Sequence, residues 1–309
     1  MKTLLKIFVL VNVLVCTHTY AQNINVDSLL DAGNSEKNQS KKQYTGATFA
    51  STRLIDGHTV ETTQGGVLDL KISHRFGRLN EGFYNMFGLD AASMRIGLDY
   101  GITNRLTIGG GRSTFEKQYD GFLKYRLLWQ SEGERSLPLS VTLLTSVMYE
   151  TDTAAVKAEK NIYLQPRTTD KLSFAYQMLI ARKFSESFSL QLMPTMIHEN
   201  IVDSVTTPND LFAVGAGARL RLSPRSNLNL EYYYQLPGYK LPGTYNTFSV
   251  GYEIETGGHV FQLHVSNSTG MTERTVISEN KGQWQAGDIH FGFNISRVFT
   301  VKKARSPKL

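Results

Sequence analysis

Residues 94–109 read MRIGLDYGITNRLTIG, and this stretch decides the fold class. Apolar and polar side chains alternate on both sides of the turn at Thr103-Asn104, with the period of two that a β-strand with two different faces requires. A turn this tight joins two antiparallel neighbours. One face carries Met94, Ile96, Leu98, Tyr100, Leu106 and Ile108, and the other carries Arg95, Gly97, Asp99, Gly101, Thr107 and Gly109.

The same alternation repeats from Val67 almost to the C-terminus, in about 12 segments joined in turn by tight turns and longer loops. An even strand number places both chain ends on the rim with the short turns, as in single-chain bacterial barrels. We therefore predict an all-β fold, a transmembrane up-and-down antiparallel β-barrel over residues 47–301. A soluble β-sandwich or propeller is the alternative. Aromatic residues near the ends of the apolar face, such as Trp129 and Phe299, favour the membrane barrel.

The first 21 residues have the layout of a secretory signal peptide. Lys2 precedes and Lys6 interrupts a short apolar run, Leu4 to Val15, and Ala21 precedes Gln22 at the expected cleavage point. The run is shorter than the about 20 apolar residues that span a bilayer. Lipidation at Cys16 is disfavoured because Val15, rather than a small residue, precedes it. Cleavage removes this single cysteine, so the mature chain can hold no disulfide.

Three further segments complete the predicted organisation. Residues 22–46 are polar and are expected to form a flexible periplasmic arm, which could bind a periplasmic protein partner. Within residues 47–66, whose role stays open, Thr48 to Ile55 could form either a short extra strand or a plug segment. Residues 302–309 form a basic tail. The formal net charge is +6 without any block of like charge, which argues against nucleic acid as a partner.

The sequence offers no pattern of catalytic, cofactor-binding or metal-binding residues. The histidines lack the spacing of a metal motif. His74 shares the lipid-facing register, where an acyl hydrolase would need a nearby serine, and the neighbouring strand supplies none on that face. We therefore assign His74 to interfacial packing. Gly109-Gly110-Gly111 lacks the Lys-Ser or Lys-Thr of a phosphate loop and indicates a bend, a bulge or room for a plug.

Charged side chains on the inward register are the candidate lumen-lining residues. In a barrel of intermediate width such charges either pair with a plug or line a narrow wet channel. Basic residues slightly outnumber acidic ones, which predicts a weak preference for anions if a channel forms. The candidates are Lys71, Arg75, Arg95, Asp99, Lys124, Arg126, Arg219, Arg221, Glu231, Glu253 and Glu255.

Several motifs together resemble an uncharacterised outer-membrane β-barrel family, a domain-of-unknown-function group found mostly in the Bacteroidota. They are TRLIDGHTVET at 52–62, ISHRFG at 72–77, FGLD at 87–90, YGITNRLTIG at 100–109 and KYRLL at 124–128. The resemblance covers roughly residues 47–300. It implies a membrane barrel and supplies neither a substrate nor catalytic residues.

These observations predict an outer-membrane protein in contact with lipid that acts as a narrow channel for a small solute, without catalysis. Two alternatives stay open. One is a non-conducting barrel that anchors a periplasmic partner through residues 22–46, and the other is a membrane-embedded lipid hydrolase or acyltransferase.

Overall fold

The computed structural model describes residues 42–302, except 134, 154–155, 158–164, 203 and 205. The predicted signal peptide at 1–21, residues 22–41 of the predicted arm and residues 303–309 of the basic tail lie outside the described residues.

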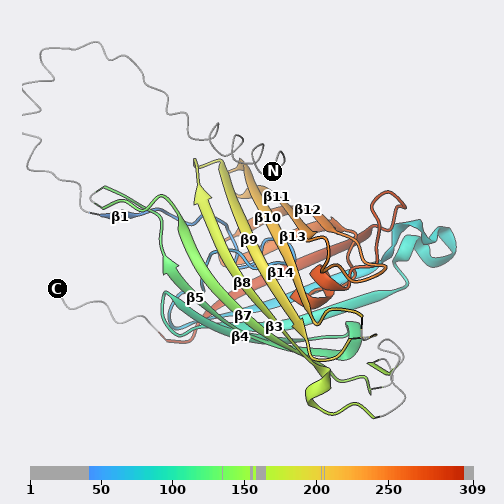
Figure 1. The fold of residues 1–309 in the computed structure, drawn as a ribbon. Coiled ribbons are helices and arrows are strands. Elements are labelled where there is room, and N and C mark those ends of the chain that lie inside the picture. The colour runs from blue at the N-terminus through green and yellow to red at the C-terminus, as the bar shows by residue number, and fades with distance from the viewer. Residues whose placement is uncertain are drawn as a thin grey trace, which may run out of the picture. The chain divides into compact units, whose positions relative to one another are not determined.

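In the described part of the chain, twelve antiparallel strands close into a barrel in chain order (Figure 1). The last strand pairs with the first wall strand through the register Ile295 to Ile72, so the sheet has no open edge. The predicted fold class is confirmed. The wall strands are β2 (Val67–Arg78), β3 (Ala92–Gly101), β4 (Leu106–Ser113), β5 (Gln118–Leu128), β7 (Ser140–Glu150), β8 (Leu172–Lys183), β9 (Phe188–Glu199), β10 (Asp210–Ser223), β11 (Ser226–Gln235), β12 (Thr247–Thr256), β13 (His259–Ser266) and β14 (His290–Thr300).

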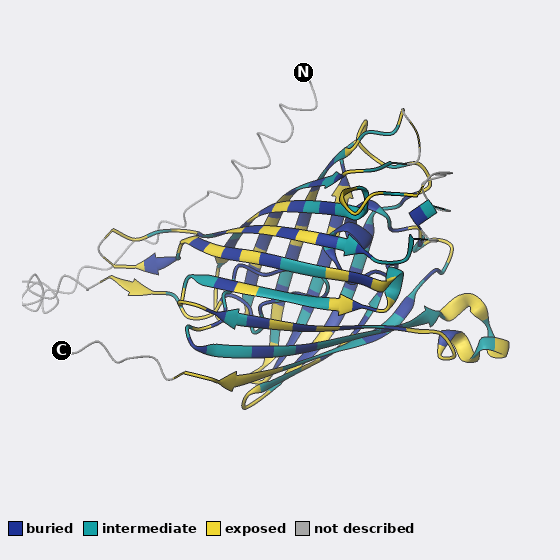
Figure 2. Ribbon diagram, turned by 90° about the horizontal axis from the view of Figure 1, so that it is seen from below, coloured by how far each residue is buried: buried dark blue, intermediate teal, exposed yellow. Residues whose placement is uncertain are grey.

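The alternation read from the sequence separates the two faces of the wall. In β3 the side chains of Arg95 and Asp99 are buried inside the barrel, whereas Ile96 and Leu98 on the other face are 45% and 47% exposed. Figure 2 shows the same banding on strand after strand. An apolar outer face and a polar inner face are what a barrel surrounded by lipid requires.

Short helices lie in the connections between strands. They are η1 (Leu79–Glu81), η2 (Phe83–Gly88), η3 (Phe115–Lys117), η4 (Thr169–Lys171) and the π-helix η5 (Arg274–Ser278). None of the helices within the described ranges has the length and apolar character needed to cross a membrane.

Two connections depart from the predicted rhythm of short turns and long loops. The β4–β5 connection on the long-loop rim is only residues 114–117, closed by positive φ angles at Glu116 and Lys117. On the other rim, residues 129–139 form a longer connection because they contain β6 (Ser131–Glu132), which pairs with β1 (Gln43–Tyr44).

Residues 45–65, named the plug here, lie inside the barrel. The plug enters from the short-turn rim beside β6, turns at Leu54–Gly57 and returns to that rim, where Gly65 pairs with Gly101. Leu54 is 1% and Val60 0% exposed. The sequence allowed either an extra strand or a plug segment, and in the structure the segment is a plug.

A second segment enters the lumen from the opposite rim. Residues 267–289, named the inserted loop, join β13 to β14 and contain η5. Val276 and Ile277 of this loop pack into an apolar cluster on the inner wall with Met148, Leu179 and Met193. The lumen is thus occupied from both ends.

The rim assignment predicts which residues a membrane-impermeant thiol reagent reaches on intact cells. Single cysteines at Asn209 and Lys281, both exposed on the long-loop rim, should be labelled, while cysteines at Asn104 and Gly257 should not. Short turns face the periplasm in bacterial barrels. Glu279 is unsuitable as a site because its carboxylate contacts Arg274 at 2.8 Å and its side chain is only 7% exposed. The reverse labelling pattern would show that the barrel has the opposite orientation in the membrane.

Candidate functional site: the plugged lumen

The side chains predicted to line the lumen are distributed over the inner wall and one rim. Arg221 is half-buried at the short-turn rim, where its guanidinium donates to the Ser223 and Pro224 carbonyls at 3.2 and 3.1 Å. Glu255 lies near that rim and accepts a hydrogen bond from Asn227 at 3.0 Å. The remaining candidates are buried inside the barrel, and they are Lys71, Arg75, Arg95, Asp99, Lys124, Arg126, Arg219, Glu231 and Glu253.

Three basic side chains of the wall hold the plug. Arg75 of β2 forms an ion pair with Asp56. Arg126 of β5 donates to the carboxylate of Glu61 at 2.6 Å and to the Val60 carbonyl at 3.1 Å. On the same strand the Lys124 ammonium lies 3.4 Å from the carbonyl of Thr52 in the plug. These contacts place two plug carboxylates against the basic side of the wall.

Two other basic residues pair within the wall itself. Lys71 lies 2.6 Å from Asp69, and Arg95 Nε donates to Asp120 at 2.8 Å. The Arg95 guanidinium lies close against β3 and β4. A Cβ at Gly97 or at Gly111 would stand only 2.7 Å from it. Glycines there make room for a wall side chain.

At other glycines the room is taken by the plug. A Cβ at Gly101 would stand 2.1 Å from the Gln64 carbonyl oxygen, and one at Gly217 would stand 2.4 Å from Leu54 Cδ2. These two positions leave hollows in the wall that the plug fills.

Uncharged amides and one carboxylate of the wall bind the main chain of the plug. Glu231 of β11 accepts hydrogen bonds from three successive backbone N–H groups, those of residues 55–57. Gln191 of β9 accepts from the Val60 N–H at 2.6 Å and donates to the His58 carbonyl at 2.8 Å. Gln262 and Asn294 donate to two further carbonyls of the plug. The sequence reasoning missed these three amides, although their inward register was a signal for them.

The plug and the inserted loop meet inside the barrel. His58 Nε2 lies 3.2 Å from the carboxylate of Glu273, and the guanidinium of Arg53 contacts the same imidazole. Arg75 bridges the two segments, since it pairs with Asp56 of the plug and donates to the Ser268 carbonyl of the loop at 3.2 Å.

The inserted loop has two polar attachments of its own. Arg274 contacts the carboxylates of Glu116, Glu150 and Glu279 at 3.2, 3.3 and 2.8 Å. At the rim, the side chain of Asn80 donates to Asp288 at 2.9 Å and lowers the pKa of that carboxyl. The loop is therefore fixed both inside the lumen and at its mouth.

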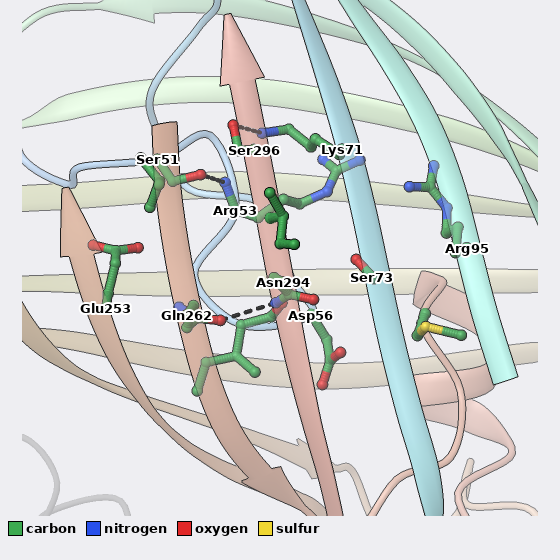
Figure 3. A pocket seen from close by; sticks show the side chains of 14 residues that line it. Ser51, Arg53, Asp56, Lys71, Ser73, Arg95, Glu253, Gln262, Asn294 and Ser296 are labelled. Atoms are coloured by element: carbon green, nitrogen blue, oxygen red, sulfur yellow. Dashed lines mark hydrogen bonds between the residues drawn. The ribbon is translucent and has the colours of Figure 1, made fainter. Parts of the chain in front are cut away.

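A cavity of about 30 Å³ lies between the plug, the inserted loop and the wall, which is room for one or two water molecules. Figure 3 shows Lys71 and Arg95 from the wall beside Arg53 and Asp56 from the plug around it. A solute larger than water fits this cavity only if the plug or the loop moves.

The described residues contain no group of three or more His, Asp or Glu side chains placed to hold a metal ion. His74 stacks on Phe293 with 4.9 Å between ring centroids and contacts Phe76, and its Nδ1 has no hydrogen-bond partner in the described part of the chain.

The chain is similar to several solved structures, among them three at 7–10% identity. The chain is similar to the NanC porin at 7% identity, with a TM-score of 0.47 over 75% of this chain and 98% of that one. It is similar to the KdgM porin at 7% identity, with a TM-score of 0.44 over 75% and 99%. The outer membrane phospholipase A of Escherichia coli matches at 10% identity and a TM-score of 0.42, over 77% and 91%.

No curated protein sequence matches the chain. A family model does match, described as a membrane bound beta barrel domain of unknown function, DUF5777, and it covers residues 49–299. This range contains most of the plug and all twelve wall strands except Thr300, the last residue of β14. The chain therefore belongs to the DUF5777 family of membrane-bound β-barrels.

Proposed function

We propose that this protein is an outer-membrane channel for small polar solutes that its own plug holds closed. The observation that carries the proposal is the way the plug is bound. Its contacts with the wall are mostly hydrogen bonds and ion pairs, such as those of Glu231, Gln191 and Arg126. Water can replace such contacts when the plug moves.

The buried apolar side chains of the plug are Phe49, Leu54, Ile55 and Val60. Phe49, Leu54 and Val60 form one cluster with Ala181 of the wall. Several buried polar atoms at the interface, including Arg75 Nε and Arg126 Nε, have no hydrogen-bond partner within the described residues. Each such group costs about 1–3 kcal/mol relative to a hydrated one.

The attachment of the plug allows it to withdraw without threading through the barrel. Both of its ends lie at the short-turn rim, where the Thr45 N–H donates to the Gln130 carbonyl and the Gly66 N–H to the Gly101 carbonyl. A periplasmic partner that binds the proposed arm, residues 22–46, would act on the plug through β1.

Replacing Gly57 with valine should open the channel. A Cβ at Gly57 would stand 2.0 Å from the Tyr233 hydroxyl, so the tip of the plug no longer fits, and such overpacking typically costs about 1–3 kcal/mol. The wall is unchanged. In planar bilayers, Gly57→Val should show more frequent openings than the unaltered protein, and Gly46→Val should not, because the nearest atom to its Cβ is 3.8 Å away.

The opened channels should be weakly selective for anions over cations. Withdrawal of the plug removes Asp56 and Glu61 and leaves Arg75, Lys124 and Arg126 on the wall without their plug contacts. If Gly57→Val carries no current at any voltage even after Arg274→Met has removed the ion pairs that hold the inserted loop, the protein is instead the non-conducting barrel of the alternative interpretation.

A further inference from the structure

The inner wall binds the plug through its main chain more than through its side chains. Glu231 accepts from the Ile55 and Gly57 N–H groups at 2.8 Å each and from the Asp56 N–H at 3.1 Å. Gln191 forms a two-way pair with the backbone, accepting from Val60 and donating to His58.

Four more wall side chains continue this pattern on other strands. Gln262 of β13 donates to the Leu54 carbonyl at 2.6 Å, and Asn294 of β14 donates to the Ile55 carbonyl at 2.8 Å. Thr142 of β7 donates to the Val60 carbonyl at 2.8 Å. Thr107 of β4 accepts from the Thr63 N–H at 2.9 Å. Wall side chains that can hydrogen-bond to peptide N–H and C=O groups thus surround the lumen.

Backbone N–H and C=O groups are the same in every peptide, so these wall groups do not depend on the sequence of the plug. The recognition of side chains is narrower. Asp56 and Glu61 meet the guanidinium groups of Arg75 and Arg126, and Leu54 enters the hollow at Gly217. The wall therefore offers hydrogen bonds to any main chain and charge pairing to carboxylate side chains.

We propose that the opened lumen binds short peptides with carboxylate side chains, which take over the contacts that the plug makes in the closed state. This inference rests on the proposed channel function and names its solute class. The vacated space is sufficient, because the plug is a two-stranded turn in which Arg53 pairs with His58. Gln191 binds one N–H group and one C=O group of the same main chain. A sugar lacks this alternation of N–H and C=O groups.

Block of ion current through Gly57→Val channels tests the proposal. The probes are the tripeptide alanyl-glutamyl-alanine, the uncharged trisaccharide maltotriose, and glutarate, which has carboxylates without peptide groups. The tripeptide should interrupt the current at concentrations about tenfold lower than either other solute, since it can form two or more additional hydrogen bonds with the wall.

A pair of wall variants separates binding of the peptide from general damage. Gln191→Leu in the Gly57→Val chain removes two hydrogen bonds to a main chain and should raise the half-blocking tripeptide concentration about tenfold. Gln177→Leu is the matched control, since Gln177 is also a buried inward amide but donates to Thr195 of the wall. Block by the tripeptide should be unchanged in the control.

Equal block by maltotriose and the tripeptide, or equal block by glutarate, would overturn the peptide proposal while leaving the channel intact. The same holds if Gln191→Leu and Gln177→Leu have equal effects. Failure of the channel itself has a different signature, because Gly57→Val would then carry no current to be blocked.

Discussion

Replacing Arg274 with methionine is expected to release the inserted loop from the lumen. The Arg274 side chain is 4% exposed, and its guanidinium is the cation shared by the carboxylates of Glu116, Glu150 and Glu279. Removing one partner from a buried network of charges typically costs about 3–5 kcal/mol, and here the carboxylates would lose the cation that they share. The loop is the part of this network that is free to move, so the cost favours its departure.

Limited trypsin digestion of the folded protein in detergent measures the release. Cleavage after Lys281, an exposed residue of the inserted loop, should become at least about tenfold faster in Arg274→Met, because a loop held by several kcal/mol opens far less often. Lys117→Met is the control, since the Lys117–Asp152 pair is exposed, and surface pairs contribute only about 0–1 kcal/mol. Equal rates of cleavage in the two variants would show that Arg274 does not fix the loop.

The wall of the barrel could be predicted from the sequence because its signal is local. In β3 and β4 each residue reveals its face through its immediate neighbours, and a shift of one residue would place Arg95 and Asp99 in lipid. The rhythm of the connections was less reliable. The pairing of β1 with β6, which lengthens residues 129–139, joins segments about 90 residues apart and leaves no local pattern.

The position of the plug could not be predicted for the same physical reason. Glu231 is separated from Ile55 by 176 residues, and the tip of the plug is fixed by that contact rather than by any regular pattern within residues 47–66. The basic residues illustrate the limit. Lys71 and Arg75 share one strand and one face, yet Lys71 pairs with Asp69 of the wall and Arg75 with Asp56 of the plug.

The central claim is that movement of the plug opens the lumen, and a reversible covalent lock tests it. Cγ1 of Ile55 lies 3.2 Å from the position of a Cβ at Gly251 of β12. Cγ1 is the place that the sulfur of a cysteine at position 55 can take, so cysteines at these two positions are neighbours that a disulfide can join. The only native cysteine is Cys16, in the predicted signal peptide, so the introduced pair has no competitor in the mature chain.

The most direct measurement is the current through single Ile55→Cys/Gly251→Cys channels in a planar bilayer under applied voltage, before and after reduction. The account predicts no openings while the disulfide holds the plug against the wall, and openings as in the unaltered protein once it is reduced. Ile55→Cys alone should not respond to the reductant. Equal openings in the oxidised and reduced double variant would contradict the account, because current would then pass without movement of the plug.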